Sequence, residues 1–189
     1  MIPPRKDNEY IRTFSGKKVW PLNPRVSDID IKDILHALPN ICRFTGHTRE
    51  FYSVAQHSCL MYLAMAGSMY DDMERKWALL HDASEAYLCD IARPVKQHLA
   101  EYKEYEDRLM KVIAKAFNLE WPMPDSVKYF DNVLLATERR DLMNGPVKIL
   151  GDYDTTPLEQ VIVPHPPKTA WIMFHKCLTE AGLHPKVGA

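Results

Sequence analysis

The stretch that decides the fold is "WALLHDASEAYLCDIARPVK", residues 77–96. It begins apolar, as the end of a buried helix would, and then places His81, Asp82 and Glu85 close together. Groups of this kind are costly to bury unless each is hydrogen-bonded, paired or bound to a metal. The rest of the chain must therefore supply both the helices that bury them and the partners that compensate them.

The composition is that of a globular domain. The chain has 189 residues, of which 46% are hydrophobic and 26% charged, enough for a real core. Its formal net charge of −1 excludes the basic footprint of a protein that coats nucleic acid. The cysteines, Cys42, Cys59, Cys89 and Cys177, form no CxxC pair. With no signal-peptide pattern and no long apolar run, we expect a cytoplasmic protein that binds neither membrane nor polymeric nucleic acid.

Apolar residues recur at spacings of three and four over much of the chain, which predicts helices. The expected helical segments are 28–40, 53–69, 71–88, 94–119, 124–143 and 167–183. Residues 1–27 are polar and favour a short extended hairpin around Ser15-Gly16, whereas residues 43–53 have no period and indicate a loop. There is no internal repeat and no parallel-strand pattern. We therefore predict an all-α single domain over residues 1–189, with its core at about 28–183.

Potential metal ligands stand at otherwise apolar positions of three predicted helices. They are His57, the pair His81-Asp82, and Asp131. Two imidazoles and two carboxylates suit a divalent transition metal such as Mn, Fe, Co or Zn. A metal of this kind lowers the pKa of a bound water toward about 7 and supplies hydroxide at neutral pH.

Glu85 follows His81 by four residues and Asp82 by three, so a helix would project all three from one face. A carboxylate there lies near the bound water without being a ligand, where a group that accepts its proton is expected. Any one of these residues alone is more often a satisfied core or surface residue. We assign that ordinary role to His36, His98, His165, His175 and His184. The combination of acids and histidines on buried helical faces favours a metal site.

The pattern resembles the H…HD…D signature of the HD-domain phosphohydrolases, whose fold is an all-α bundle. The stretches "RFTGHTREFYSVAQHS" (43–58), "HDASEAYLCDIARPVK" (81–96) and "DNVLLATERRDL" (131–142) resemble one branch in particular. That branch contains bacterial YfbR-like 5′-deoxynucleotidases and phage dATP triphosphohydrolases of the DatZ type. The similarity spans roughly residues 43–141 and implies an HD-type bundle. It also implies that the metal ligands are His57, His81, Asp82 and Asp131.

Further roles follow from the same resemblance. Glu85 matches the catalytic acid, and Asp90 and Lys96 match positions that contact the sugar and the phosphate. Arg43 matches an arginine that reaches the phosphate. Phe44 stands where relatives often have tryptophan beside the base, and Arg93 where some have a small polar residue. Further substrate-binding candidates in the same loop are His47 and Arg49. Glu138 is a candidate partner for Arg139 or Arg140, either beside the site or as a surface salt bridge.

The implied function is hydrolysis of the 5′ phosphoester of a deoxynucleoside monophosphate by metal-activated water. One alternative is a dATP-preferring triphosphohydrolase that releases deoxynucleoside and triphosphate, with Mg accompanying the substrate. An alternative of another class is a non-catalytic module that binds metal or nucleotide. A cyclic-nucleotide phosphodiesterase ranks low, because it would need extra histidine ligands for a second metal. Relatives form homo-oligomers, so we expect a dimer or larger assembly, in the host cytoplasm if a phage encodes it.

Overall fold

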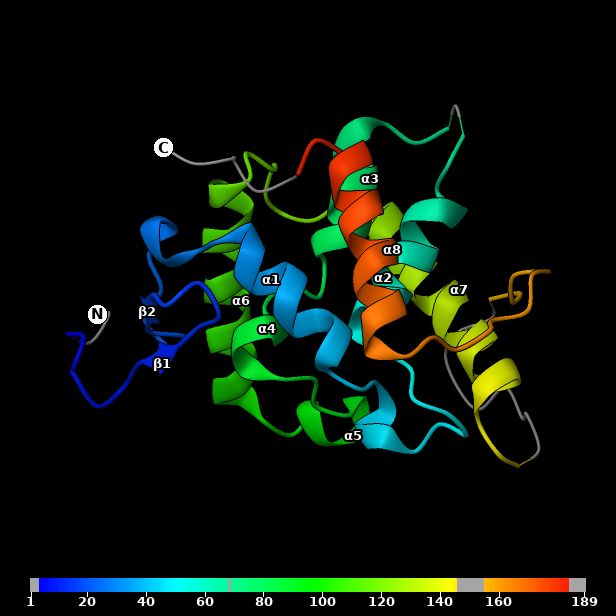
Figure 1. Ribbon diagram of the computed structural model, residues 1–189, viewed down its shortest axis with the longest axis horizontal. Coiled ribbons are helices and arrows are strands. Elements are labelled where there is room, and N and C mark those ends of the chain that lie inside the picture. The colour runs from blue at the N-terminus through cyan, green and yellow to red at the C-terminus, as the bar shows by residue number, and fades with distance from the viewer. Residues whose placement is uncertain (1–3, 68, 146–154, 184–189) are drawn as a thin grey trace.

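The computed structural model describes residues 4–67, 69–145 and 155–183 and is mainly helical (Figure 1). The longer helices are α1 (Ile31–Ala37), α2 (Val54–Ala64), α3 (Asp72–Leu80), α6 (Ala100–Ala116), α7 (Asp125–Leu142) and α8 (Pro167–Glu180). Shorter ones are α4 (Glu85–Leu88), α5 (Arg93–Lys96) and the 3-10 turns η1 (Val26–Asp28), η2 (Leu38–Asn40) and η3 (Phe44–Gly46). The predicted all-α fold is confirmed. His184 lies outside the described residues.

The predicted hairpin is also confirmed. Strands β1 (Ile11–Arg12) and β2 (Lys18–Val19) pair antiparallel, and Gly16 supplies the positive φ of 84° that their turn requires. Buried Asp33 on α1 accepts hydrogen bonds from the Ser15 backbone N, at 2.6 Å, and from Ser15 Oγ, at 2.9 Å. These bonds satisfy the buried carboxylate and tie the hairpin to the helical body.

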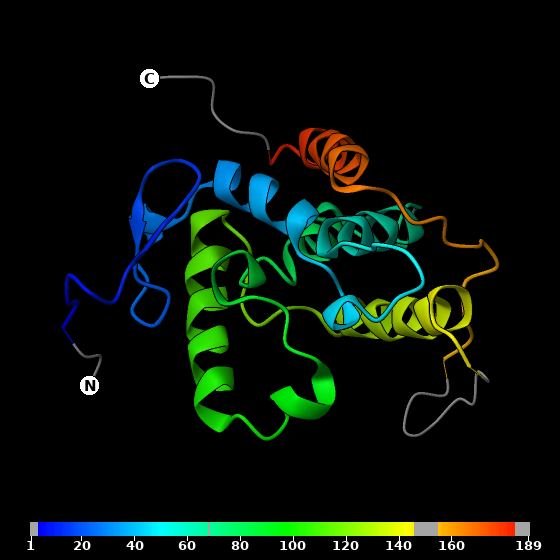
Figure 2. The same cartoon turned by 60° about the horizontal axis from the view of Figure 1, so that its bottom comes forward.

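Helix α2 is the centre of the packing. It is buried on almost all sides and contacts α3, α7, α8 and η2. Figure 2 shows α8 on one side of α2 and α7 on the other. A helix that is apolar all round is stable only when other helices surround it. The Ser53 side chain accepts a hydrogen bond from the Gln56 backbone N and caps the start of α2, which fixes the position of His57 in its first turns.

Two segments predicted as single helices are interrupted. The segment 71–88 leaves α-helical geometry after Leu80, and residues 81–84 form tight turns before α4 begins. Backbone bonds there span three residues, as in Ala83 N to Leu80 O and Glu85 N to Asp82 O, both 3.0 Å. This tighter winding brings residues three apart onto one side of the chain, which aligns Asp82 with Glu85.

The segment 94–119 is likewise divided, into α5 and α6. Residues 97–99 separate them, and Leu99 has φ −108° and ψ 77°, outside the helical region. Helix α5 therefore contacts α6 instead of continuing into it as one helix (Figure 2). In the part of the chain that the structure describes, no helix combines the length and the apolar character needed to cross a membrane.

Truncation of a core leucine on α7 tests this packing. Leu134 is fully buried, so Leu134→Ala should lower the free energy of unfolding by about 2–5 kcal/mol in a urea titration. Leu63 on α2 is 48% exposed, and Leu63→Ala, the matched control, should lower it by less than about 1 kcal/mol. Equal losses for the two variants would contradict the observed burial.

Candidate metal centre

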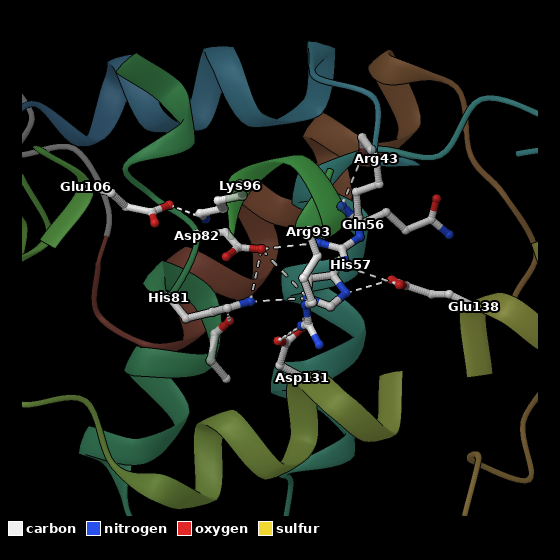
Figure 3. A network of polar contacts seen from close by, with 12 residues as sticks. Arg43, Gln56, His57, His81, Asp82, Arg93, Lys96, Glu106, Asp131 and Glu138 are labelled. Carbon is white, nitrogen blue, oxygen red and sulfur yellow. Dashed lines mark hydrogen bonds and ion pairs between the residues drawn. The ribbon is translucent and has the colours of Figure 1, made fainter. Parts of the chain in front are cut away.

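Three helices that are distant in sequence bring their polar side chains to one point. His57 comes from α2, His81 from the end of α3 and Asp131 from α7 (Figure 3). The two Nε2 atoms lie 3.1 Å apart, and Asp131 Oδ1 lies 3.4 Å from His57 Nε2. Asp82 Oδ2 lies 3.1 Å from His81 Nε2 and 3.9 Å from His57 Nε2. The four residues predicted as ligands are therefore brought together.

Hydrogen bonds orient both imidazole rings. His57 Nδ1 lies 2.6 Å from Glu138 Oε1, and His81 Nδ1 lies 2.9 Å from the carbonyl oxygen of Ala78. Each acceptor favours a proton on Nδ1, which leaves the lone pair on Nε2. Two lone pairs facing each other at 3.1 Å repel unless a cation lies between them. The rings are thus arranged to share either a proton or a metal ion.

The spacing of these atoms fits a metal ion. Nitrogen and oxygen ligands lie about 2.0–2.2 Å from zinc, so neighbouring ligand atoms around such an ion are about 3.0–3.4 Å apart. The measured separations of 3.1 and 3.4 Å fall in this range. The group His57, His81 and Asp131 can therefore hold a metal ion, and Asp82 lies within reach of the same position.

An ion-pair network centred on a fully buried carboxylate lies behind the candidate ligands. Glu138 is 0% exposed and binds His57 on one side and Arg43 Nη2, at 3.1 Å, on the other. Arg43 Nη1 in turn lies 3.2 Å from Asp82 Oδ2. Burial alone would raise the pKa of Glu138, but Arg43 and His57 outweigh it and lower that pKa. Glu138 is therefore the anion that balances both cationic partners.

The electrostatics of His57 follow from this network. Burial and the Arg43 guanidinium would lower its pKa, yet the Glu138 and Asp131 carboxylates raise it to about 9. In the absence of a metal, a proton on His57 therefore compensates the surrounding acids. A divalent ion bound by the same atoms would replace that proton, since a ligating imidazole nitrogen must be unprotonated.

The predicted partner of Glu138 is wrong. Arg140 pairs instead with its neighbour Asp141, and Arg139 lines the cavity described below. Glu138 faces inward because it lies two helical turns after Asp131, on the same face of α7. The spacing in the sequence contained this signal, whereas the presence of two adjacent arginines suggested a local pairing.

A cavity of about 460 Å³ opens beside the centre. Its acidic lining residues are Asp82, Glu85, Asp90 and Asp131, and its basic and aromatic ones are Arg43, Phe44, His47, Arg93, Lys96 and Arg139. Most of the candidate substrate-binding residues are therefore on its wall. Arg49 is not among the lining residues: its guanidinium donates to the carbonyl oxygens of Asp141 and Met143 and fixes the 43–53 loop to the end of α7.

Glu85 combines burial with an unpaired acceptor. It is 4% exposed, and its Oε2 has no hydrogen-bond partner among the described residues. Burial, together with the nearby Asp82 and Asp90 carboxylates, raises the pKa of Glu85 well above its usual range. Burial first, and then the Asp82 carboxylate, also raise the pKa of Asp90. A buried carboxylate with a raised pKa and a free acceptor oxygen has the properties required of a general acid or base.

Two cations on the cavity wall have anionic partners that the sequence did not indicate. Arg93 Nη2 donates to Asp131 Oδ2, at 3.1 Å, and thereby holds the second oxygen of that carboxylate (Figure 3). Lys96 forms an ion pair with Glu106 of α6. Glu106 was missed because the interruption at residues 97–99 separates it from Lys96, so no helical spacing relates the two.

Comparison with known proteins finds relatives that are similar over most of this chain. The chain is 44% identical over 133 residues to the uncharacterized protein YfdR of Escherichia coli (strain K12), which covers 70% of this chain and 72% of YfdR. The chain belongs to the YfdR family. It is also 38% identical over 122 residues to the uncharacterized protein RCAP_rcc00048 of Rhodobacter capsulatus, 62% of either chain. A search against family models found no match.

Removal of the Glu138 charge tests how this YfdR-family centre is supported. Glu138→Gln keeps the side-chain size but removes the anion that orients His57 and balances Arg43. The Kd for Mn²⁺ or Co²⁺, measured by isothermal titration calorimetry, should rise about 10–100-fold. Glu101→Gln, at an exposed position on α6, is the control and should leave it unchanged. An unaltered Kd in a folded Glu138→Gln protein would contradict the role of Glu138.

Proposed function

We propose that this chain is an HD-domain metal-dependent phosphohydrolase that hydrolyses the 5′ phosphoester of a deoxynucleoside monophosphate. The observation that carries the proposal is the position of the buried acid Glu85 on a cation-lined cavity whose wall also includes the ligand candidates Asp82 and Asp131. A divalent metal bound there supplies Lewis acidity and a water of lowered pKa. The chain's own residues would bind, orient and exchange protons around the substrate.

Glu85 is proposed to handle the proton of the attacking water. Its unpartnered Oε2 is available as an acceptor, and its raised pKa allows it to give the proton up again to the leaving oxygen. Glu85 lines two cavities, and the reacting phosphate would lie in the one whose wall also includes Asp82 and Asp131.

The cations of the wall would neutralise the phosphate. Lys96 and Arg139 provide positive charge, and preorganised charge of this kind stabilises the transition state of phosphoryl transfer. The two Nη atoms of Arg43 already bind Asp82 and Glu138, but its Nε has no partner among the described residues, which leaves one donor for a ligand oxygen. Asp90 would accept a hydrogen bond from the sugar, and the Phe44 ring would lie beside the base.

One observation favours a second candidate, a triphosphohydrolase that prefers dATP. Arg93, Arg139 and His47 line the cavity in addition to Lys96, and such a set could neutralise a longer phosphate chain. The products would then be a deoxynucleoside and triphosphate. The hydrolytic residues are common to both candidates, so the reaction products distinguish them.

Product analysis tests the proposal. Protein loaded in turn with Mn²⁺, Co²⁺ and Zn²⁺ would be incubated with each dNMP and dNTP, and the products separated by ion-exchange chromatography. We expect inorganic phosphate from dNMPs, with dNTPs unchanged. Release of intact triphosphate would establish the second candidate instead. No product with any metal would refute an enzyme and, where a nucleotide still binds, leave the non-catalytic binding module.

Glu85→Gln tests the assignment of the proton acceptor. It should lower kcat by about 10²–10⁴-fold, the contribution typical of general acid–base catalysis. The Kd values for metal and nucleotide, measured by calorimetry, should change less than about threefold, because Glu85 is not among the ligand candidates. A kcat equal to that of the wild type would refute the role of Glu85.

A further inference from the structure

Helix α6 contacts the cavity wall from outside through one face. Tyr102 and Glu106 lie one turn apart on this face. The Tyr102 hydroxyl donates to the carbonyl oxygen of Cys89, at 2.8 Å, and the Glu106 carboxylate binds Lys96 Nζ. The Tyr102 ring also lies 5.7 Å from Lys96 Nζ. Helix α6 therefore contacts both the segment that carries Asp90 and the side chain of Lys96 on the cavity wall.

The backbone at Cys89 makes the tyrosine contact important. Cys89 has a φ of 63°, which is unfavourable for a residue other than glycine and persists only where neighbouring contacts enforce it. The Tyr102 hydrogen bond to Cys89 is one such contact. It fixes α6 relative to the 89–92 segment, so the carboxylate of Glu106 stands at a defined position beside Lys96.

Lys96 has competing anions within the cavity. Burial would lower its pKa, but Glu106 is the leading group that raises it, and Asp82 and Glu85 raise it further. Glu106 and Lys96 have side chains that are 20% and 24% exposed, so their attraction is only partly screened by water. Figure 3 shows the Glu106–Lys96 pair next to Asp82.

We propose that Glu106 is a positioning residue that holds the Lys96 ammonium on the cavity wall and keeps it from pairing with the acids inside. A lysine released from Glu106 would turn toward Glu85 or Asp90. The bound phosphate would then lose a cation, and the acid would gain an ion-pair partner. Glu106 itself does not touch the substrate. This inference rests on the proposed function, because it assumes that Lys96 binds a phosphate.

The test uses Glu106→Gln in the metal-loaded full chain, with inorganic phosphate as the probe. Calorimetry should show phosphate binding about tenfold weaker than in the wild type, the loss expected for one misplaced charge-assisted hydrogen bond. Glu104→Gln, exposed on the same helix, is the matched control and should bind like the wild type. Thermal melts of both variants would show that each is folded.

Two further measurements separate positioning from mere folding. In a double-mutant cycle, Glu106→Gln should have no effect on phosphate binding once Lys96→Met is present. With a dNMP substrate, Glu106→Gln should lower kcat/KM at least tenfold, and Glu106→Asp should restore part of it. Unchanged or tighter phosphate binding by Glu106→Gln would overturn the inference. Because phosphate binding needs no turnover, that result is distinct from a wild type without hydrolysis, which would overturn the proposed function.

Discussion

The hydrogen bond between His57 and Glu138 is the interaction on which the rest of the site depends. Both groups are fully buried, and a buried carboxylate of this kind is tolerated only when cationic donors surround it. His57 and Arg43 provide these donors from α2 and from the loop before it, while Glu138 belongs to α7. The same network therefore joins three segments of the core and sets the orientation of the candidate ligands.

This arrangement orients the candidate ligands through contacts within the chain itself. His57 is fixed by Glu138, His81 by the carbonyl oxygen of Ala78, Asp82 by Arg43, and Asp131 by Arg93. Each candidate ligand thus has a second contact that limits its rotation, and such contacts hold ligands in place and tune the metal. The cavity beside them combines buried acids with cations, a composition suited to a ligand that carries both negative charge and hydroxyl groups.

Apolar periodicity was sufficient to predict the helical class, and the Ser15-Gly16 turn was sufficient to predict the hairpin. The four ligand candidates followed from the cost of burying charge and from the family resemblance. Periodicity did not predict the interruption at residues 81–84, where side-chain placement at the site overrides helix continuation, or that at Leu99. The sequence pattern also did not predict side-chain contacts between distant segments. Arg43 meets Glu138 across 95 residues, and Lys96 meets Glu106 across a change of chain direction. Local charges next to Glu138 suggested a nearer partner, which the packing of α7 excludes.

The most direct measurement is anomalous diffraction from crystals of the protein soaked in Mn²⁺ or Co²⁺. We predict one strong peak about 2.0–2.2 Å from the Nε2 atoms of His57 and His81 and from the Asp131 carboxylate. Absence of a peak there at saturating metal, with the two Nε2 atoms still 3.1 Å apart, would contradict a metal centre. It would mean that a proton alone joins the two histidines.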